Sequence, residues 1–227
     1  MPVFKPPTDW ESVYAARPDE YTFGEEPSQL ARSALRFFRA FGGNPAQARA
    51  LDLGSGEGRD TAFLAGAGFH VVARDVAPAG LEKTRALLER QNVSLERVDL
   101  ALGDVRAFDY PIETYDLALA ANVFQFLAPD EAPAHIARLQ AATKPGGICA
   151  VGVFSPAMLA WGAELDGHFT ATADDLMARF PATEGWRLLD RTEYWTYRRE
   201  DDVMASFAFI VARKADATFS REPGLTE

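Results

Sequence analysis

Helical and strand-like hydrophobic patterns alternate along the chain between residues 27 and 154. The spacing of apolar positions predicts helices over residues 27–41, 60–67, 78–91 and 129–143, and strands over residues 49–53, 70–74, 95–102, 115–121 and 148–154. The segments 115–121 and 148–154 are almost wholly apolar, which is typical of central strands buried on both faces. This alternation predicts an α/β protein with a parallel sheet and helices on both of its faces.

The alternation ends after residue 154. We expect a short helix over residues 174–180, followed by two strands over residues 186–197 and 205–214. The charged residues 198–202 between these strands predict a solvated turn, and therefore an antiparallel hairpin. Residues 1–214 are expected to form a single domain, and the polar residues 215–227 are expected to form a flexible tail.

Composition and charge exclude several classes of partner and site. The 227 residues include 33 acidic and 23 basic ones, so the net charge is −10, which argues against a main role in binding nucleic acid or an anionic membrane surface. A single cysteine, Cys149, excludes an internal disulfide, and its apolar neighbours predict a core position. Residues 1–10 hold no signal-type apolar segment, and no stretch reaches about 18 apolar residues, so a cytoplasmic location is expected.

A glycine-rich loop between a predicted strand and a predicted helix is the most informative segment of the chain. In residues 51–58 (LDLGSGEG), Gly54 permits a sharp turn, while Gly56 and Gly58 are expected to let a ligand approach the backbone. Asp75 ends the next predicted strand, a position from which a carboxylate meets the two hydroxyls of a ribose. Asp75 also fits the role of N-cap before Pro78, and both roles are compatible.

The spacing of the glycines and the nearby charges discriminate between cofactors. The dinucleotide fingerprint is G-x-G-x-x-G, whereas this loop has G-x-G-x-G. Asp52 and Glu57 would repel a pyrophosphate, but they suit a ligand with an ammonium or sulfonium centre. The loop therefore favours S-adenosylmethionine (SAM) over a nicotinamide dinucleotide.

Five segments in order, over residues 49–154, resemble the motifs of the class I SAM-dependent methyltransferases. Residues 51–58 resemble motif I, Asp75 the ribose acid, residues 103–105 (GDV) the adenine loop, residues 115–122 (YDLALAAN) motif IV, and residues 144–147 (KPGG) the turn before the fifth strand. This resemblance implies a doubly wound, Rossmann-like, mostly parallel sheet of seven strands, with the antiparallel hairpin at the C-terminal end.

Further segments are similar to the tellurite-resistance and thiopurine-type enzymes, which act on small molecules. These segments are residues 56–60 (GEGRD), 68–71 (GFHV) and 21–28 (YTFGEEPS). The last resembles the part of those enzymes that folds over SAM, which implies that residues 1–45, the N-terminal arm and first helix, act as a lid. Residues 124–127 (FQFL) lack the histidine pair that many other methyltransferases carry at this position, so no histidine base is expected there.

The expected cofactor site gathers at the carboxyl ends of the strands. Its candidate residues are Asp52, Gly54, Ser55, Gly56, Gly58, Arg59, Asp75, Val76, Asp104, Val105, Ala120, Asn122, Tyr14 and Tyr21. Among these, the Gly54 carbonyl and the region of Ala120 and Asn122 are expected to face the methionine ammonium, and Tyr14, Tyr21 and Arg59 are candidates for its carboxylate or for the lid. No metal site is expected.

The acceptor site is less defined. No catalytic residue is assigned, and His168 is the candidate base. Trp161 and Phe169 either wall an apolar pocket or belong to a loop that covers the sheet edge, and the aromatic residues 194–197 fit packing on a sheet face.

The leading hypothesis is a SAM-dependent methyltransferase that acts on a small molecule, such as a metalloid oxyanion, a thiol or a small amine, and releases S-adenosylhomocysteine. A monomer or a homodimer fits this hypothesis. One alternative is a SAM-binding protein without transferase activity. Another is an NAD(P)-binding oxidoreductase, which would need a Tyr–Lys pair or a histidine base that the sequence does not place.

Overall fold

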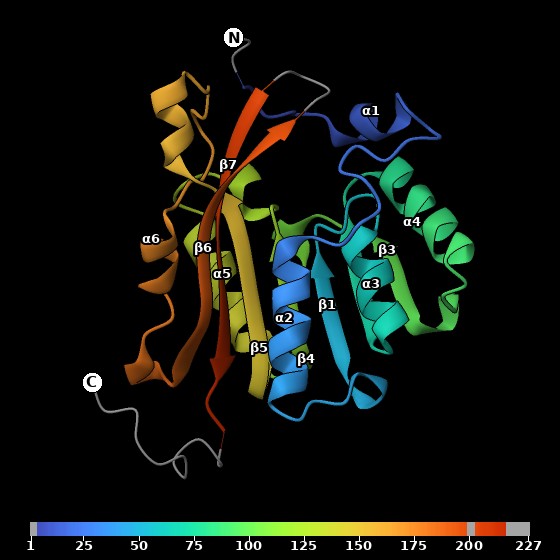
Figure 1. Cartoon of the computed structure of the whole chain (residues 1–227), viewed down its shortest axis with the longest axis vertical. Helices are drawn as coiled ribbons and strands as arrows, with labels where there is room; N and C mark the ends of the chain where they lie inside the picture. Colours follow the sequence, from blue (N-terminus) through green and yellow to red (C-terminus); the bar gives the residue numbers. More distant parts are fainter. Residues whose placement is uncertain (1–3, 199–202, 217–227) are drawn as a thin grey trace.

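The computed structural model describes residues 4–198 and 203–216. These residues fold around one seven-stranded sheet (Figure 1). Its strands are β1 (Arg49–Leu53), β2 (His70–Asp75), β3 (Val98–Leu102), β4 (Tyr115–Ala121), β5 (Thr143–Phe154), β6 (Trp186–Arg198) and β7 (Val203–Lys214). The order across the sheet is β3-β2-β1-β4-β5-β7-β6. The first five strands are parallel, and β7 runs antiparallel to both β5 and β6.

Helices cover both faces of this sheet, as the hydrophobic pattern predicts. Helices α2 (Gln29–Ala40), α3 (Arg59–Ala67) and α4 (Pro78–Arg90) pack on one face, and α5 (Ala132–Ala142) and α6 (Ala173–Met177) pack on the other. Neighbouring residues of β1 face opposite sides of the sheet. Ala50 belongs to the hydrophobic core under α2, α3 and α4, whereas Leu51 and Leu53 belong to the core under α5 and α6. The prediction of a doubly wound α/β fold with an antiparallel C-terminal hairpin is therefore confirmed.

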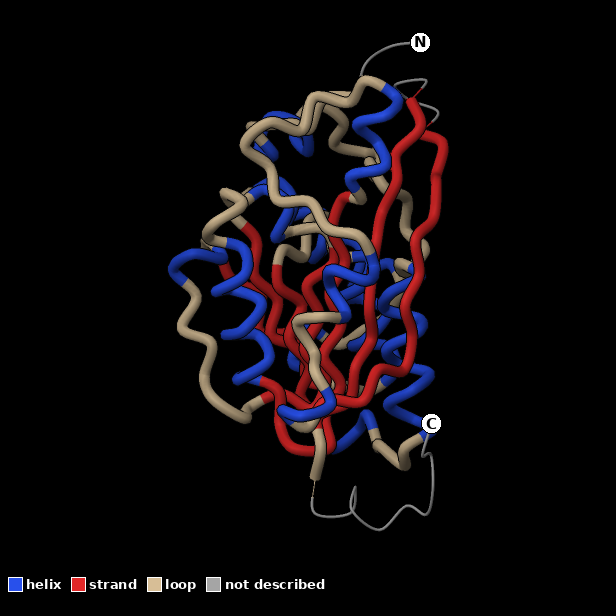
Figure 2. Tube along the Cα trace, turned by 90° about the vertical axis from the view of Figure 1, so that its left-hand side faces the viewer, coloured by secondary structure: helices blue, strands red, loops and turns tan. Residues whose placement is uncertain are grey.

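The N-terminal segment lies across the carboxyl ends of the parallel strands. Helix α1 (Trp10–Ala15) lies at this end in both views (Figures 1 and 2). Asp9 caps the helix by accepting a hydrogen bond from the Ser12 N–H at 3.1 Å. The hydrophobic pattern did not predict α1, because six residues are too few to show a helical period.

Other boundaries also differ from the prediction, each for a local reason. Residues 95–97 form a 3-10 turn instead of the first part of β3, because the Ser94 hydroxyl accepts from the Glu96 N–H. Helix α5 begins at Ala132, three residues later than expected. The expected turn at residues 144–147 lies within β5, where the pairing with β4 shifts register and Gly146 has a φ of +79°.

The C-terminal hairpin places β7 in the interior of the sheet and β6 at its edge. Tyr194 of β6 packs against Phe207 and Phe209 of β7, as expected of a sheet face. Cys149 lies in β5 and is fully buried, so its predicted core position is confirmed. The turn expected around residues 199–202 and the tail from residue 217 lie outside the described residues. Among the helices that are described, none has the length and apolar character needed to cross a bilayer.

The strand order creates a switch point between β1 and β4. From β1 the chain continues toward β2, whereas β4 continues toward β5 on the other side. The loops that follow β1 and β4 therefore diverge and open a crevice beyond the carboxyl ends of the strands, where ligands bind in open α/β sheets.

Candidate functional site

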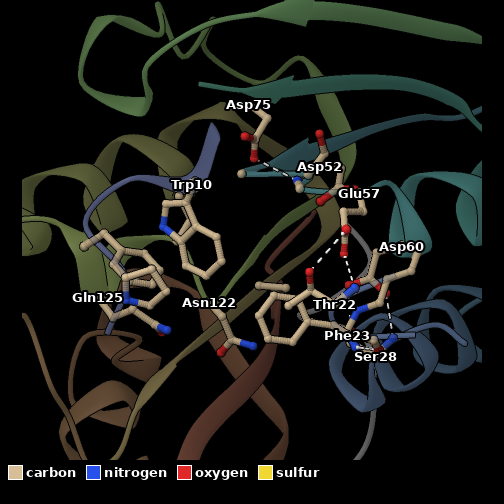
Figure 3. Close-up of a pocket in the computed structure, with 18 of the residues that line it drawn as sticks. Trp10, Thr22, Phe23, Ser28, Asp52, Glu57, Asp60, Asp75, Asn122 and Gln125 are labelled. Atoms are coloured by element: carbon tan, nitrogen blue, oxygen red, sulfur yellow. Dashed lines mark hydrogen bonds between the residues drawn. The ribbon is translucent and has the colours of Figure 1, made fainter. Parts of the chain in front are cut away.

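A cavity of about 950 Å³ opens at this switch point, beneath the N-terminal segment (Figure 3). Most of the predicted cofactor residues line it: Tyr14, Asp52, Gly54, Ser55, Gly56, Arg59, Asp75, Val76, Asp104, Val105 and Asn122. They come from the ends of β1 and β2, from the segments that follow β1, β2, β3 and β4, and from α1, so the topology gathers segments that are far apart in the sequence.

Three predicted residues do not line the cavity. Gly58 (φ +86°) faces Thr84 on α4, where a Cβ atom would come within 2.5 Å of the threonine side chain, so this glycine permits helix packing and not ligand approach. Ala120 is fully buried in the core, and its neighbour Ala121 lines the cavity instead. Tyr21 donates from its hydroxyl to the backbone carbonyl of Lys83 at 3.0 Å, outside the cavity.

Three consecutive backbone N–H groups of the glycine loop are already paired. The N–H groups of Gly54 and Ser55 both donate to the Arg74 carbonyl, at 2.8 and 3.0 Å, and the Gly56 N–H donates to Asp75 at 2.7 Å. Gly54 (φ +74°) also lies against Val123, where a Cβ atom would come within 2.5 Å of the valine side chain. A pyrophosphate would need such N–H groups free, so these three are not available to bind one.

Ser55 and Asp75 offer polar atoms to a ligand. The Ser55 hydroxyl is buried beside the cavity and has no hydrogen-bond partner in the described part of the chain. Asp75 accepts from the N–H groups of Gly56 and Ala77, at 2.7 and 3.0 Å, and each carboxylate oxygen keeps a further lone pair. Asp75 thus fixes the turn before α4, although the N-cap itself is Ala77. Burial raises the pKa of Asp75, and the two N–H groups oppose that rise.

Asp52 is the most deeply buried carboxylate of the cavity, with 1% of its surface exposed. Its Oδ2 accepts from the Thr61 hydroxyl at 2.6 Å. Burial, together with the negative charge of Asp60 and Asp75, raises the pKa of Asp52 to about 7. A cationic ligand beside Asp52 would favour its ionised form and would therefore bind together with the loss of a proton.

Glu57 does not serve the role expected from its place in the loop. Its carboxylate is buried and accepts from the Lys83 ammonium at 2.7 Å and from the Thr22 N–H at 2.7 Å. The charge of Glu57 is therefore balanced by Lys83 and is not free to attract a cation. Asp52 is therefore the carboxylate of this loop region that could attract a positively charged ligand.

The segment from Thr22 to Ser28 is held over the cavity by residues of the glycine loop and α3. Besides the Thr22–Glu57 contact, the Arg59 guanidinium donates to the Phe23 carbonyl at 3.1 Å. Asp60 accepts from the N–H and the hydroxyl of Ser28, at 2.6 and 2.7 Å. Figure 3 shows the Thr22–Glu57 and Ser28–Asp60 pairs side by side at one edge of the cavity. We call this segment the strap.

Sequence reasoning missed several residues that line the cavity, among them Phe4, Trp10, Gln125 and Phe126. Two of these, Gln125 and Phe126, lie in the segment FQFL. That segment was interpreted only by the histidines that it lacks. Trp161 and Phe169 do not line the cavity. Trp161 is exposed at the surface, where its ring contacts that of Trp195, and Phe169 belongs to the core.

His168 lines the cavity, as a catalytic residue would need to. Its Nδ1 lies 3.1 Å from the Asp166 carbonyl oxygen, and its ring lies 6.0 Å from that of Phe126 between centroids. A carbonyl oxygen can only accept, so this contact places the proton of a neutral imidazole on Nδ1 and leaves Nε2 as the acceptor. In residues 4–198 and 203–216, no three metal-ligating side chains form a cluster.

The strand order, the glycine loop after β1 and the acid at the end of β2 agree with the doubly wound fold that the motifs predicted. Residues 50–147, which are less than half of the chain, match the family described as a methyltransferase domain. This match confirms the resemblance of these residues to the SAM-dependent methyltransferases.

Similarity to curated proteins is confined to part of each chain. Hemagglutinin 1 of Eikenella corrodens is 37% identical over 102 residues, which are 45% of this chain and 33% of that protein. The probable SAM-dependent methyltransferase TehB of Haemophilus influenzae is 30% identical over 99 residues, which are 44% of this chain and 33% of that protein. The chain spans a third of the length of each of these two relatives.

Solved structures share the fold over most of the chain. TehB of Haemophilus influenzae superposes with a TM-score of 0.63 and 20% identity, over 91% of this chain and 67% of that one. A 1,6-didemethyltoxoflavin-N1-methyltransferase of Burkholderia thailandensis superposes with a TM-score of 0.62 and 24% identity, over 90% of this chain and 85% of that one. At these identities the likeness establishes the fold alone.

Proposed function

We propose that this protein transfers a methyl group from SAM to a small-molecule acceptor, with residues 1–214 acting as one domain. The observation that carries the proposal is the pairing of the Gly56 N–H with Asp75 beside the cavity, since it leaves a carboxylate facing the cavity and takes up an N–H group that a phosphate would need. Paired N–H groups in this loop also disfavour the NAD(P)-binding alternative.

The residues that line the cavity fit the parts of this cofactor. Asp75 would accept from the ribose hydroxyls, and Asp104 and Val105 would border the adenine. The carboxylate of Asp52 and the carbonyl of Gly54 would face the methionine ammonium, with Asn122 beside them and with Tyr14 and Arg59 under the strap. Ser55 offers its unpaired hydroxyl to the same ligand.

The protein's own contribution is to orient two reactants and to exclude water. Bound SAM supplies a methyl group that is already activated by its positively charged sulfur. The strap and α1 close the cavity from above, which holds the acceptor in place and keeps the site dry. His168 is the candidate to take a proton from an acceptor that needs deprotonation, through its Nε2. The acceptor classes compatible with the sequence are metalloid oxyanions, thiols and small amines.

Calorimetric titration of the purified protein tests the cofactor first. We expect SAM and S-adenosylhomocysteine to bind with micromolar dissociation constants and NAD to give no signal. Incubation with SAM and a panel of tellurite, thiols and amines should then yield S-adenosylhomocysteine, measured by mass spectrometry. Binding of NAD instead of SAM would contradict the proposal, and SAM binding without product across a broad panel would favour a SAM-binding protein that lacks transferase activity.

The raised pKa of Asp52 predicts proton release when SAM binds. Near pH 7 part of the Asp52 carboxyl is protonated, and the positive ligand should ionise it, so a fraction of a proton leaves on binding. Calorimetry in phosphate and in Tris, which differ in ionisation enthalpy, measures this number directly. The variant Asp52→Asn should abolish the release. Equal release by the variant and the unaltered protein would assign the proton to another group.

A further inference from the structure

The charged residues that line the cavity come from one half of the sheet and from the strap. Apart from Glu26 of the strap, they lie at the ends of β1 and β2, in the segments after β1 and β3, and at the start of α3. From Ala121 to Phe207, the described lining residues include no Asp, Glu, Lys or Arg, and His168 and Tyr194 are the titratable groups there. We call this uncharged part, beyond β4, the acceptor side.

Aromatic rings from distant segments form a continuous surface on the acceptor side. The surface consists of Phe4, Trp10, Phe126, Phe154, Tyr194 and Phe207, and we call it the aromatic wall. Ring centroids are 5.1 Å apart for Trp10 and Phe126, 5.8 Å for Phe126 and Phe154, and 5.5 Å for Phe154 and Phe207. The first two contacts are edge-to-face. Packing of this kind fixes the rings in place, so the wall presents a rigid apolar surface.

A buried amide oxygen without a partner lies beside the aromatic wall. Gln125 lines the cavity with 2% of its surface exposed, and its Oε1 has no hydrogen-bond partner among the residues described. Figure 3 shows Gln125 on the same side of the cavity as Trp10, away from Asp52 and Glu57. Buried amides are almost always hydrogen-bonded, and an unpaired one is destabilising, so this group points to a partner that the protein itself does not supply.

We propose that the methyl acceptor is an uncharged, flat aromatic molecule with one hydrogen-bonding substituent. The proposal rests on the methyltransferase function proposed above and specifies the substrate class of the same site. The aromatic ring packs against the aromatic wall, and its polar substituent pairs with the amide of Gln125. Aromatic thiols and amines belong to this class, whereas metalloid oxyanions do not.

The distribution of charge argues against an ionic acceptor. An anion on the acceptor side would lose its hydration without meeting an uncompensated cation, since Arg59 and Asp60 act on Tyr194 with opposite charges and Arg106 is paired with Asp104 and Glu131. A cationic amine would likewise meet no carboxylate there. A neutral ring with one polar atom is the ligand whose polar and apolar parts both find partners.

Binding of probe compounds to the protein saturated with S-adenosylhomocysteine tests this proposal. The probes are 2-naphthol, the non-aromatic 2-decalol, the anionic 2-naphthoate and tellurite, and the readouts are calorimetry and quenching of naphthol fluorescence. We expect 2-naphthol to bind at least tenfold more tightly than each of the other three. Equal or tighter binding of 2-decalol, 2-naphthoate or tellurite would overturn the proposal, and so would the absence of any naphthol binding to the saturated protein.

Two variants and a matched control locate the probe. Gln125→Met keeps the length of the side chain but removes the amide, and Trp10→Leu removes one ring of the wall. Each should weaken 2-naphthol binding about five- to tenfold, and Gln125→Met should leave the dissociation constant of S-adenosylhomocysteine unchanged. The control Trp161→Leu, at an exposed tryptophan outside the cavity, should change neither constant. Unaltered naphthol binding in both variants would contradict the assignment.

Saturation with S-adenosylhomocysteine separates this proposal from the broader one. If that ligand does not bind, the proposed methyltransferase function itself is contradicted. If it binds and tellurite or an aliphatic compound is preferred over 2-naphthol, the methyltransferase function stands and the aromatic acceptor class is wrong.

Discussion

Replacing Asp75 with alanine should weaken SAM binding by about 1–3 kcal/mol, the cost of losing hydrogen bonds from two hydroxyls to a charged acceptor. This corresponds to an increase of about 5- to 150-fold in the dissociation constant. The structure adds a second reason to expect the upper part of the range. Asp75 also holds the Gly56 N–H at 2.7 Å and the Ala77 N–H at 3.0 Å, so the variant loses both the ribose contact and the order of the glycine loop.

The variant Asp116→Ala is the matched control for Asp75→Ala. Asp116 is a partly buried carboxylate on the same sheet, but it lies at the start of β4, where it accepts from the Arg49 N–H and the Lys144 ammonium. Its loss should lower the free energy of unfolding and leave the dissociation constant of SAM unchanged. Calorimetric titration of both variants measures the difference. Unaltered SAM affinity in Asp75→Ala would remove this carboxylate from the cofactor site.

Local features explain why so much of the fold was predictable. The strand over residues 49–53 and the start of the next helix are marked by a short apolar run and a glycine cluster, which are signals within about a dozen residues. The same glycines locate the cavity, because a loop after the first strand of a doubly wound sheet lies at the switch point. Asp75 could be placed there for the same reason, since it ends the neighbouring strand.

Contacts between distant segments explain what the sequence did not reveal. Thr22 meets Glu57 across 35 positions, and Trp10 meets Phe126 across more than a hundred. Hydrophobic periodicity reports which face of a segment is buried, but it does not report the partner. The aromatic wall therefore appeared in the sequence only as separate aromatic residues, and the strap only as a resemblance.

Gly58 and Glu57 show a second limit of prediction from sequence, because their place in a motif does not determine which way each residue faces. The glycine was expected to admit a ligand, yet its missing side chain makes room for Thr84 of α4. The glutamate was expected to attract a cation, yet Lys83, 26 positions along the chain, already neutralises it. A motif therefore predicts where a loop lies more reliably than it predicts the role of each residue in it.

Replacing Lys83 with methionine should destabilise the protein by about 3–5 kcal/mol, because the substitution leaves the carboxylate of Glu57 buried without a compensating charge. The side chains of Lys83 and Glu57 are 7% and 4% exposed, and their charged atoms are 2.7 Å apart. The Lys83 ammonium also donates to the Glu20 carbonyl at 2.8 Å, just before the strap begins. Urea denaturation followed by circular dichroism measures the free energy of unfolding.

A second substitution and a surface pair show whether burial causes this effect. The double variant Glu57→Gln/Lys83→Met removes both charges and should be more stable than Lys83→Met alone, since no unpaired charge remains inside. The control Lys144→Met breaks the ion pair between Lys144 and Asp116, whose side chains are 38% and 25% exposed. This substitution should lower the free energy of unfolding by at most about 1 kcal/mol. If Lys83→Met costs no more than Lys144→Met, the strap is not anchored by a buried ion pair. In that case the Thr22–Glu57 and Ser28–Asp60 hydrogen bonds hold the strap without help from Lys83.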